Sequence, residues 1–310
     1  MRKVIGIGET ILDIIFRGDQ PHSALPGGSA FNSMVSLSRL GVPVSFIGEL
    51  GNDRVGEIVR RFMQANGMTT DYIDCFPDGK SPVSLAFLNK ANDAEYIFYT
   101  HYPDRRSSIS YPVINADDIV LFGSFYAVHP LTRDRIVELL EYARERQAII
   151  YYDPNFRQMH AHEAIRVRST IMDNYEFAGM VRGSDEDFLH LYGLTDMDKV
   201  YRDEVGFYCK TLITTRGTQG VNLYTETLRR HFETPVVTPV STVGAGDNFN
   251  AGIIYGLIKY GIGYHDLPAL SEPTWAKIIR CGMELAAEAC QNYANYIPVE
   301  FAEKYRENIS

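Results

Sequence analysis

A run of small residues that ends in an aspartate is the part of this sequence best suited to chemistry. It reads Gly244-Ala245-Gly246-Asp247 and leads into a helix expected over residues 246–260. A loop of small residues at the start of a helix exposes unpaired backbone N–H groups at the positive end of the helix dipole. Glycine also lets a ligand come close to the backbone. The sequence therefore predicts a phosphate-binding loop at this position.

Asp247 needs a role of its own, because its carboxylate would repel a phosphate bound in such a loop. It could accept the proton of an attacking hydroxyl group and orient that group in line with the γ-phosphoryl group of a nucleotide. Taken alone, it could equally be a first-turn acidic residue that complements the helix dipole. The rest of the chain has to decide between these two interpretations.

A second cluster of small residues precedes the first expected helix. Gly27 and Gly28 form a turn just before residues 30–40, and Asn32 follows near the start of that helix. Adjacent glycines allow a ligand to approach the backbone, and an asparagine side chain offers both a donor and an acceptor. The same residues could also be an ordinary turn and N-cap.

Two common nucleotide-binding patterns do not occur. The chain has no GxxxxGK[ST] sequence, and Gly6-Ile7-Gly8 lacks the third glycine of a dinucleotide-binding fingerprint. P-loop enzymes and Rossmann-type oxidoreductases are therefore disfavoured.

Strand-like apolar runs alternate with longer amphipathic stretches over most of the chain. We expect strands over 3–8, 44–48, 118–123, 148–153 and 210–215, and helices over 30–40, 53–66, 131–146, 163–174, 246–260 and 274–293. This alternation predicts an α/β fold in which helices cover a mainly parallel sheet.

Two β-rich segments, about 9–26 and 81–101, interrupt the alternation, and the second reads as a hairpin that turns at Asn92-Asp93. We expect both segments in a small lid beside the main sheet, where they could exclude water from a cleft.

Composition narrows the class of protein. The 310 residues carry a net charge of −9 without a Lys/Arg tract, which argues against a nucleic-acid partner. No apolar run approaches the roughly 20 residues that span a bilayer, so no membrane partner is expected. The four cysteines form no CxxC pair and the eight histidines form no ligand pattern, so we predict neither a zinc site nor a disulfide framework. A reducing, cytoplasmic location fits best, and the lack of repeats and linkers indicates one domain over 1–310.

The two glycine clusters together resemble the motifs of the ribokinase-like PfkB carbohydrate kinases. Residues 240–252 resemble the C-terminal motif DTxGAGDxFxxG, and residues 27–32 resemble the N-terminal motif GGxxxN. Further matches follow in the family order along nearly the whole chain, including residues 48–53, 153–157 and 215–220. The resemblance implies a ribokinase-like three-layer α/β/α domain with a small β-sheet lid.

The resemblance also implies ATP and Mg²⁺ as cofactors and a role for individual residues. Asp247 would be the catalytic base, with Gly244, Ala245 and Gly246 as an anion hole. Substrate-binding residues would be Asp13, Gly27, Gly28, Asn32 and Arg157. Nucleotide-binding residues would be Ser184, Thr215, Gly217 and Gly220, and Asp187 would organise magnesium through water.

Two departures from the family pattern affect the ions. The usual NxxE reads Ser184-Asp185-Glu186-Asp187, which shortens the acidic side chain that organises magnesium. The usual DT before the anion hole reads Ser241-Thr242, so activation by a monovalent cation such as potassium stays open.

The pattern around residues 153–157 and the 82–99 flap is closest to fructokinases and 2-keto-3-deoxygluconate kinases. We therefore predict ATP-dependent phosphorylation of a sugar hydroxyl, with fructose as the leading acceptor and a keto-deoxy sugar acid as the alternative. Ribokinase or nucleoside kinase activity and a non-catalytic ligand-binding role rank below these. Arg157 could contact a sugar hydroxyl, a substrate carboxylate or the phosphoryl group, or it could form a surface salt bridge.

Three further expectations concern the surroundings of the site. Arg105 and Arg106 read as a solvated loop and are left out of it. The adenine would lie against apolar groups within 286–297. A homodimer could form through the open edges of the lid.

Overall fold

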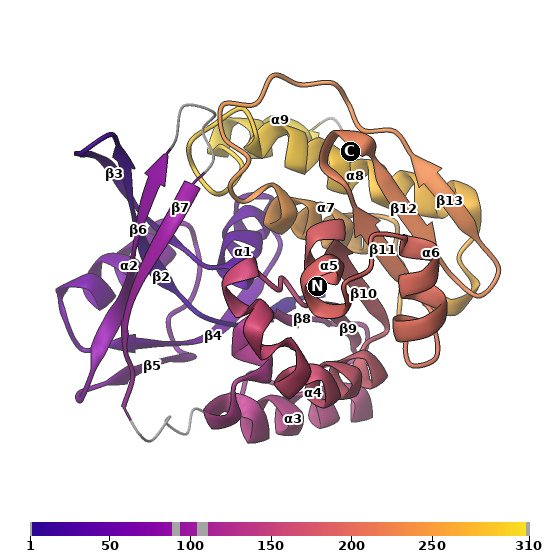
Figure 1. Cartoon of the computed structure of the whole chain (residues 1–310), viewed down its shortest axis with the longest axis horizontal. Coiled ribbons are helices and arrows are strands. Elements are labelled where there is room, and N and C mark those ends of the chain that lie inside the picture. Colours follow the sequence, from indigo (N-terminus) through magenta and orange to yellow (C-terminus); the bar gives the residue numbers. More distant parts are fainter. Residues whose placement is uncertain (1, 89–93, 104–110, 308–310) are drawn as a thin grey trace.

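The strands of this protein form two separate sheets, one large and one small (Figure 1). The structure is a computed structural model that describes residues 2–88, 94–103 and 111–307. Within these ranges the large sheet, sheet A, has the order β13-β12-β11-β10-β9-β8-β1-β4-β5. Its strands are β1 (Val4–Ile7), β4 (Val44–Gly51), β5 (Ile73–Phe76), β8 (Ile119–Gly123), β9 (Ile149–Asp153), β10 (Met180–Ser184), β11 (Leu212–Thr215), β12 (Val221–Tyr224) and β13 (Arg229–Phe232).

Sheet A is mainly parallel, as the sequence predicts. All neighbours from β5 to β11 run in the same direction, and β12 and β13 add an antiparallel edge. The carboxyl ends of the parallel strands therefore meet along one edge of the sheet, which is where ligands bind in such folds.

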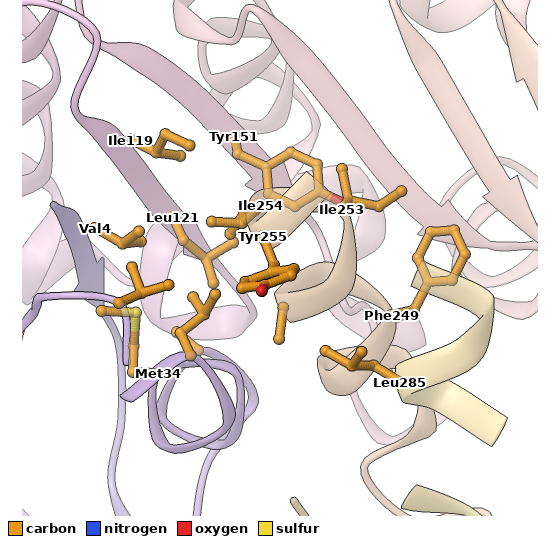
Figure 2. Packing of buried hydrophobic residues seen from close by; sticks show 14 of the residues in the cluster. Val4, Met34, Ile119, Leu121, Tyr151, Phe249, Ile253, Ile254, Tyr255 and Leu285 are labelled. Atoms are coloured by element: carbon orange, nitrogen blue, oxygen red, sulfur yellow. The ribbon is translucent and has the colours of Figure 1, made fainter. Parts of the chain in front are cut away.

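Helices cover both faces of sheet A. Successive strand residues point to opposite faces, so Val4, Leu121 and Tyr151 join one core cluster while Ile5, Val120 and Tyr152 join the other. The first cluster packs under α1 (Ser29–Arg39), α2 (Arg54–Ala65), α7 (Ala245–Lys259), α8 (Glu272–Ala289) and α9 (Val299–Glu307). The second packs under α3 (Pro130–Glu145), α4 (Ala164–Phe177), α5 (Asp185–Tyr192) and α6 (Met197–Lys199). Figure 2 shows part of the first cluster, with Met34 of α1 and Ile254 of α7 beside strand residues. The three-layer α/β/α arrangement is confirmed.

The small sheet, sheet B, stands to the left of the main body in Figure 1. Its order is β3-β2-β6-β7, with strands β2 (Ile11–Arg17), β3 (Gln20–Gly27), β6 (Lys80–Leu88) and β7 (Ala94–His101). The antiparallel β6–β7 pair confirms the predicted hairpin, although its Asn92-Asp93 turn lies outside the described residues. Parallel pairing of β2 with β6 joins the two β-rich segments into one sheet.

The sequence analysis did not predict β10 and α5, although β10 lies between β9 and β11 in sheet A. β10 contains a charged residue, Arg182, and a glycine within five residues, so its apolar pattern is broken. The short helices η1 (Phe125–Val128), η2 (Gln158–Glu163), η3 (Val200–Val205), η4 (Gly217–Gln219) and η5 (Leu267–Ala269) complete the described elements. None of the helices in the described ranges has both the length and the apolar character needed to cross a membrane.

Candidate active site

The phosphate-binding loop predicted from the sequence is the start of α7. Gly244 is the N-cap residue of this helix, with a φ of 77°, and no side chain caps the first turn. A Cβ atom at position 244 would lie 2.5 Å from the backbone oxygen of Asn295. Both the positive φ and this close contact therefore require glycine at this position. The N–H groups of Gly246 and Asp247 belong to the uncapped first turn of the helix and point to its positive end. This geometry suits an anion.

Asp247 lies in that first turn and is 7 % exposed. Its Oδ2 accepts a hydrogen bond of 2.8 Å from Asn32 Nδ2. Burial raises the pKa of Asp247 to about 6, against the opposing effects of the Asn32 hydrogen bond and the positive charge of Arg157. The carboxylate is therefore mostly ionised at pH 7 and sits close to the range in which a general base works well.

Asn32 reaches Asp247 because α1 and α7 pack side by side. The turn at Gly28, with a φ of 131°, starts α1, and Ser33 Oγ donates to the Asp247 backbone oxygen over 2.7 Å. Asn32 is 4 % exposed, and its Oδ1 finds no hydrogen-bond partner among the residues that the structure describes. A buried acceptor without a partner is costly, so a ligand hydroxyl that donates to it would be favoured.

The lid contributes Asp13 to the same site. This residue lies in β2 opposite Ser84 of β6, and Ser84 Oγ donates to its Oδ1. Asn295 Nδ2 donates to its Oδ2 over 3.1 Å. Burial raises the pKa of Asp13 to about 6, and the negative charge of Asp247 adds to this effect. A Cβ atom at Gly27 would lie 2.3 Å from Asp13 Oδ2, so the glycine makes room for the carboxylate.

The end of β9 supplies the third side of the site. Asp153 ends the strand, and its Oδ1 accepts a 3.0 Å hydrogen bond from the Asn155 backbone N–H. Asn155 has a φ of 40°, a strained conformation that clusters at functional sites. Arg157 is exposed, and its charge acts on the pKa of Asp247, so the two groups are within electrostatic reach.

The predicted nucleotide residues lie at the ends of β10 and β11. Thr215 ends β11, and the following turn contains Gly217 with a φ of 52° and Gly220 with a φ of 94°. A side chain at Gly220 would collide with His231 and with the Phe232 backbone oxygen, each 2.5 Å from the Cβ position. Ser184 ends β10 and starts α5. These residues share the carboxyl edge of sheet A with Asp153.

Ser184 and Asp187 form a capping box at the start of α5. Asp187 Oδ2 accepts from the Ser184 backbone N–H over 2.6 Å and from Ser184 Oγ over 2.7 Å. Within the described residues no group of three or more His, Cys, Asp or Glu side chains could enclose a metal ion. Mg²⁺ in kinases usually binds through phosphates, water and one or two carboxylates, and the first turn of α5 carries the carboxylates of Asp185, Glu186 and Asp187.

Three residues of the site were missed by the sequence analysis. Asn295 holds Asp13 with its side chain, while its backbone oxygen accepts from Asn248 Nδ2 over 2.9 Å. Ser84 of the lid binds the same carboxylate, and Arg182 of β10 lies behind α7. Of these three residues, only Arg182 stands out in the sequence, because it is a charged residue inside an otherwise apolar run. Arg105 and Arg106 lie outside the described residues.

A buried carboxylate beside an uncapped helix start, facing a lid at the carboxyl edge of a parallel sheet, is an arrangement suited to phosphoryl transfer. The family of pfkB carbohydrate kinases matches residues 1–301. The chain therefore belongs to the pfkB carbohydrate kinase family, and it is an ATP-dependent sugar kinase.

Relatives in sequence agree with this assignment. The chain is 28 % identical over 262 residues to a fructokinase of Rhizobium leguminosarum bv. trifolii, covering 82 % of this chain and 79 % of the relative. It is 25 % identical over 271 residues to probable fructokinase-4 of Arabidopsis thaliana, covering 82 % of each. An aminoimidazole riboside kinase of Salmonella typhimurium is 26 % identical over 274 residues, with 87 % and 85 % covered.

Solved structures share the fold. A double mutant of a fructokinase from Vibrio cholerae O395, bound to fructose, ADP and a potassium ion, superposes with a TM-score of 0.84 at 19 % identity over 98 % of both chains. An aminoimidazole riboside kinase from Salmonella enterica, bound to aminoimidazole riboside and an ATP analogue, gives 0.82 at 22 % identity over the full length of both chains.

Proposed function

We propose that this enzyme transfers the γ-phosphoryl group of ATP to a hydroxyl of fructose, with Asp247 as the general base and Gly244, Ala245 and Gly246 as the anion hole. The observation that carries this proposal is the Asp247 carboxylate, buried beside the uncapped start of α7 and held by Asn32. The names of the relatives favour fructose as the acceptor.

Each residue has a distinct part in the reaction. Asp13 and Asn32 bind and orient sugar hydroxyls, since both are buried polar groups at the junction of lid and helix. As the acceptor oxygen attacks the γ-phosphorus, its proton passes to Asp247 while the bond from phosphorus to the ADP oxygen breaks. The backbone N–H groups at the start of α7 stabilise the charge on the transferring group. The proton on Asp247 is then lost to solvent.

The nucleotide lies along the ends of β10 and β11 in this proposal. Thr215, Gly217 and Gly220 shape the turn beside it, and Ser184 caps the neighbouring helix. Mg²⁺, organised through water by Asp187, supplies charge neutralisation for the phosphates when bound. The whole chain acts as one kinase domain with the lid inserted, and its four free thiols fit a cytoplasmic location.

A screen of acceptors with ATP and magnesium tests the substrate. Fructose, 2-keto-3-deoxygluconate, ribose, tagatose, adenosine and aminoimidazole riboside are compared for ATP consumption, with the Asp247→Asn protein as blank. Fructose should be the best acceptor. Preference for the keto-deoxy acid would favour the second candidate, a sugar-acid kinase in which exposed Arg157 near Asp247 binds the carboxylate. No turnover with any acceptor would contradict the fructokinase proposal.

The same variant tests the base. Asp247→Asn should lower kcat by at least about 10²-fold while ATP binding stays within about threefold of the wild type. Asp118→Asn is the matched control. Asp118 is also buried, but it accepts hydrogen bonds from the Lys3 and Asn115 backbone N–H groups at the amino ends of the parallel strands, opposite to the site. Near-normal turnover of the Asp247→Asn protein would remove Asp247 from the mechanism.

The lid also provides a surface for a homodimer. β7 is an edge strand of sheet B, and its Ile97, Phe98 and Tyr99 side chains are 44 %, 41 % and 59 % exposed. Large apolar side chains on an open edge favour pairing with a second copy. Light scattering should give twice the chain mass, and a monomer at working concentration would rule this assembly out.

A further inference from the structure

A buried arginine lies directly behind the first turn of α7. Arg182 comes from the middle of β10, and only 7 % of its side chain is exposed. A Cβ atom placed on Gly246 would lie 2.9 Å from its Nη1 and 3.0 Å from its Nη2. Its Cζ atom lies 5.7 Å from the centre of the Phe249 ring, one turn further along α7. The guanidinium therefore fills the space that any side chain at position 246 would need.

The guanidinium fastens the ends of two neighbouring strands to α7. Its Nη1 donates to Asp153 Oδ2 over 2.9 Å, and its Nη2 donates to Thr215 Oγ1 over 2.5 Å. The same Asp153 oxygen accepts from Asn250 Nδ2 over 2.6 Å, and Asn250 Oδ1 accepts from the Tyr151 hydroxyl over 3.0 Å. β9, β10, β11 and α7 thus meet at one hydrogen-bonded cluster under the proposed anion hole.

The contacts of Arg182 with Asp153 and Thr215 both favour the binding of an anion at the start of α7. Its positive charge opposes the buried charge of Asp153, which would otherwise repel a phosphoryl group at the start of α7. Because Thr215 Oγ1 already accepts from Arg182, its own hydroxyl hydrogen is left to donate to a ligand. The Nε atom of Arg182 is buried without a hydrogen-bond partner within the described part of the chain, so the arginine is retained at some cost in stability.

We propose that Arg182 is a positioning residue for phosphoryl transfer, which holds the first turn of α7 and the Thr215 hydroxyl in place around the phosphates. This inference rests on the proposed anion-hole role of Gly244, Ala245 and Gly246. A lysine could not replace it fully, because one ammonium lacks the planar fork that reaches two strand ends. Loss of Arg182 should therefore slow the transfer step more than it weakens sugar binding.

The test uses Arg182→Met and the charge-neutral double variant Arg182→Met/Asp153→Asn. We expect kcat to fall about 10- to 100-fold in both proteins, while the KM for the sugar changes less than about threefold. The double variant should recover thermal stability, because no buried charge is left unpaired. Arg182→Lys should retain an intermediate kcat. In all variants, the affinity for ADP with aluminium fluoride and the sugar should fall with kcat, while the affinity for ADP alone changes little.

A matched control separates positioning from general stability. Arg133 of α3 is also mostly buried and binds Asn174, but it belongs to the helical layer on the face of sheet A opposite to α7. Arg133→Met should lower stability and leave kcat unchanged. A folded Arg182→Met protein with wild-type kcat, or a double variant whose kcat recovers together with its stability, would overturn the proposal. If Asp247→Asn were active instead, the general-base proposal would fail and the result for Arg182 would still stand on its own measurement.

Discussion

Asp153, at the sheet side of the site, is buried beside a cation, whereas Asp13 and Asp247, at the lid side, are buried beside amides and hydroxyls. Burial raises the pKa of all three carboxyl groups, but at Asp153 the charge of Arg182 works against this effect. Neither Asp13 nor Asp247 has an ion-pair partner in the described ranges. The sheet side thus contains a charge that is already balanced and serves as a fixed support. On the lid side, the carboxylates of Asp13 and Asp247 are not balanced by an ion pair within the described part of the chain. They can therefore still accept a hydrogen bond or a proton from a ligand hydroxyl.

The largest expected difference between the two sides is in folding stability. Asp153→Asn leaves Arg182 buried and unpaired, which should lower the free energy of unfolding by about 3 kcal/mol. Urea unfolding at pH 7 measures this loss. A variant as stable as the wild type would show that Asp153 is not the main compensation for the arginine.

Asp13→Asn should lower catalysis without lowering the folding stability, because burial raises the pKa of Asp13 to about 6 and the neutral side chain is not disfavoured there. In the proposed site the substitution removes the negative charge and replaces one of the two acceptor oxygens with an NH2 donor, so kcat/KM for the sugar should fall by about 10²-fold, mostly through KM, because a sugar hydroxyl loses its acceptor. Steady-state kinetics with a fixed saturating concentration of ATP give this value. Ser84→Ala keeps the carboxylate and should cost less than about tenfold; an equal loss in both variants would assign the effect to lid geometry.

Neutralising Asp247 should stabilise the protein. A folded-state pKa of about 6, above the usual 3.8, means that the folded state binds this proton more tightly than the unfolded state. The resulting stability is fully present below about pH 4 and is lost as the pH rises through 6. Asp247→Asn should therefore raise the free energy of unfolding by about 3 kcal/mol at pH 8, with little gain at pH 4. A destabilised variant at pH 8 would contradict the direction of the pKa shift.

The smallest effect should be the pH dependence of the wild type. In the proposed mechanism, protonation of Asp247 removes the base and protonation of Asp13 weakens sugar binding, so kcat/KM should fall as the pH drops through about 6. The slope of log(kcat/KM) should lie between one and two per pH unit, because two interacting groups titrate together. In the Asp13→Asn protein the slope should be one. An activity that is flat down to pH 5 would show that neither group titrates in this range.

Much of the fold follows from local pattern. Strands such as β1 and β8 are continuous apolar runs, and the glycine-rich start of α7 fixes its own helix boundary, so both were predicted from the sequence. β10 was missed because Arg182 stands in its middle, and an arginine there is explained only by a partner, Asp153, that lies 29 residues away in the chain. Candidate site residues can be named from the sequence where a motif is compact, as at Gly244 to Asp247, which form the N-cap and first turn of α7. Asn295 and Ser84 were missed because each makes its contact with Asp13 across the lid, which no local pattern records.

The contact between Asn295 and Asp13 spans 282 residues of sequence. The backbone of Asn295 also lies against Gly244, so one residue late in the chain contacts both the lid and the start of α7. During synthesis the N-terminal strands and the lid leave the ribosome long before this residue does. The proposed sugar site therefore cannot be complete until almost the whole chain has been made.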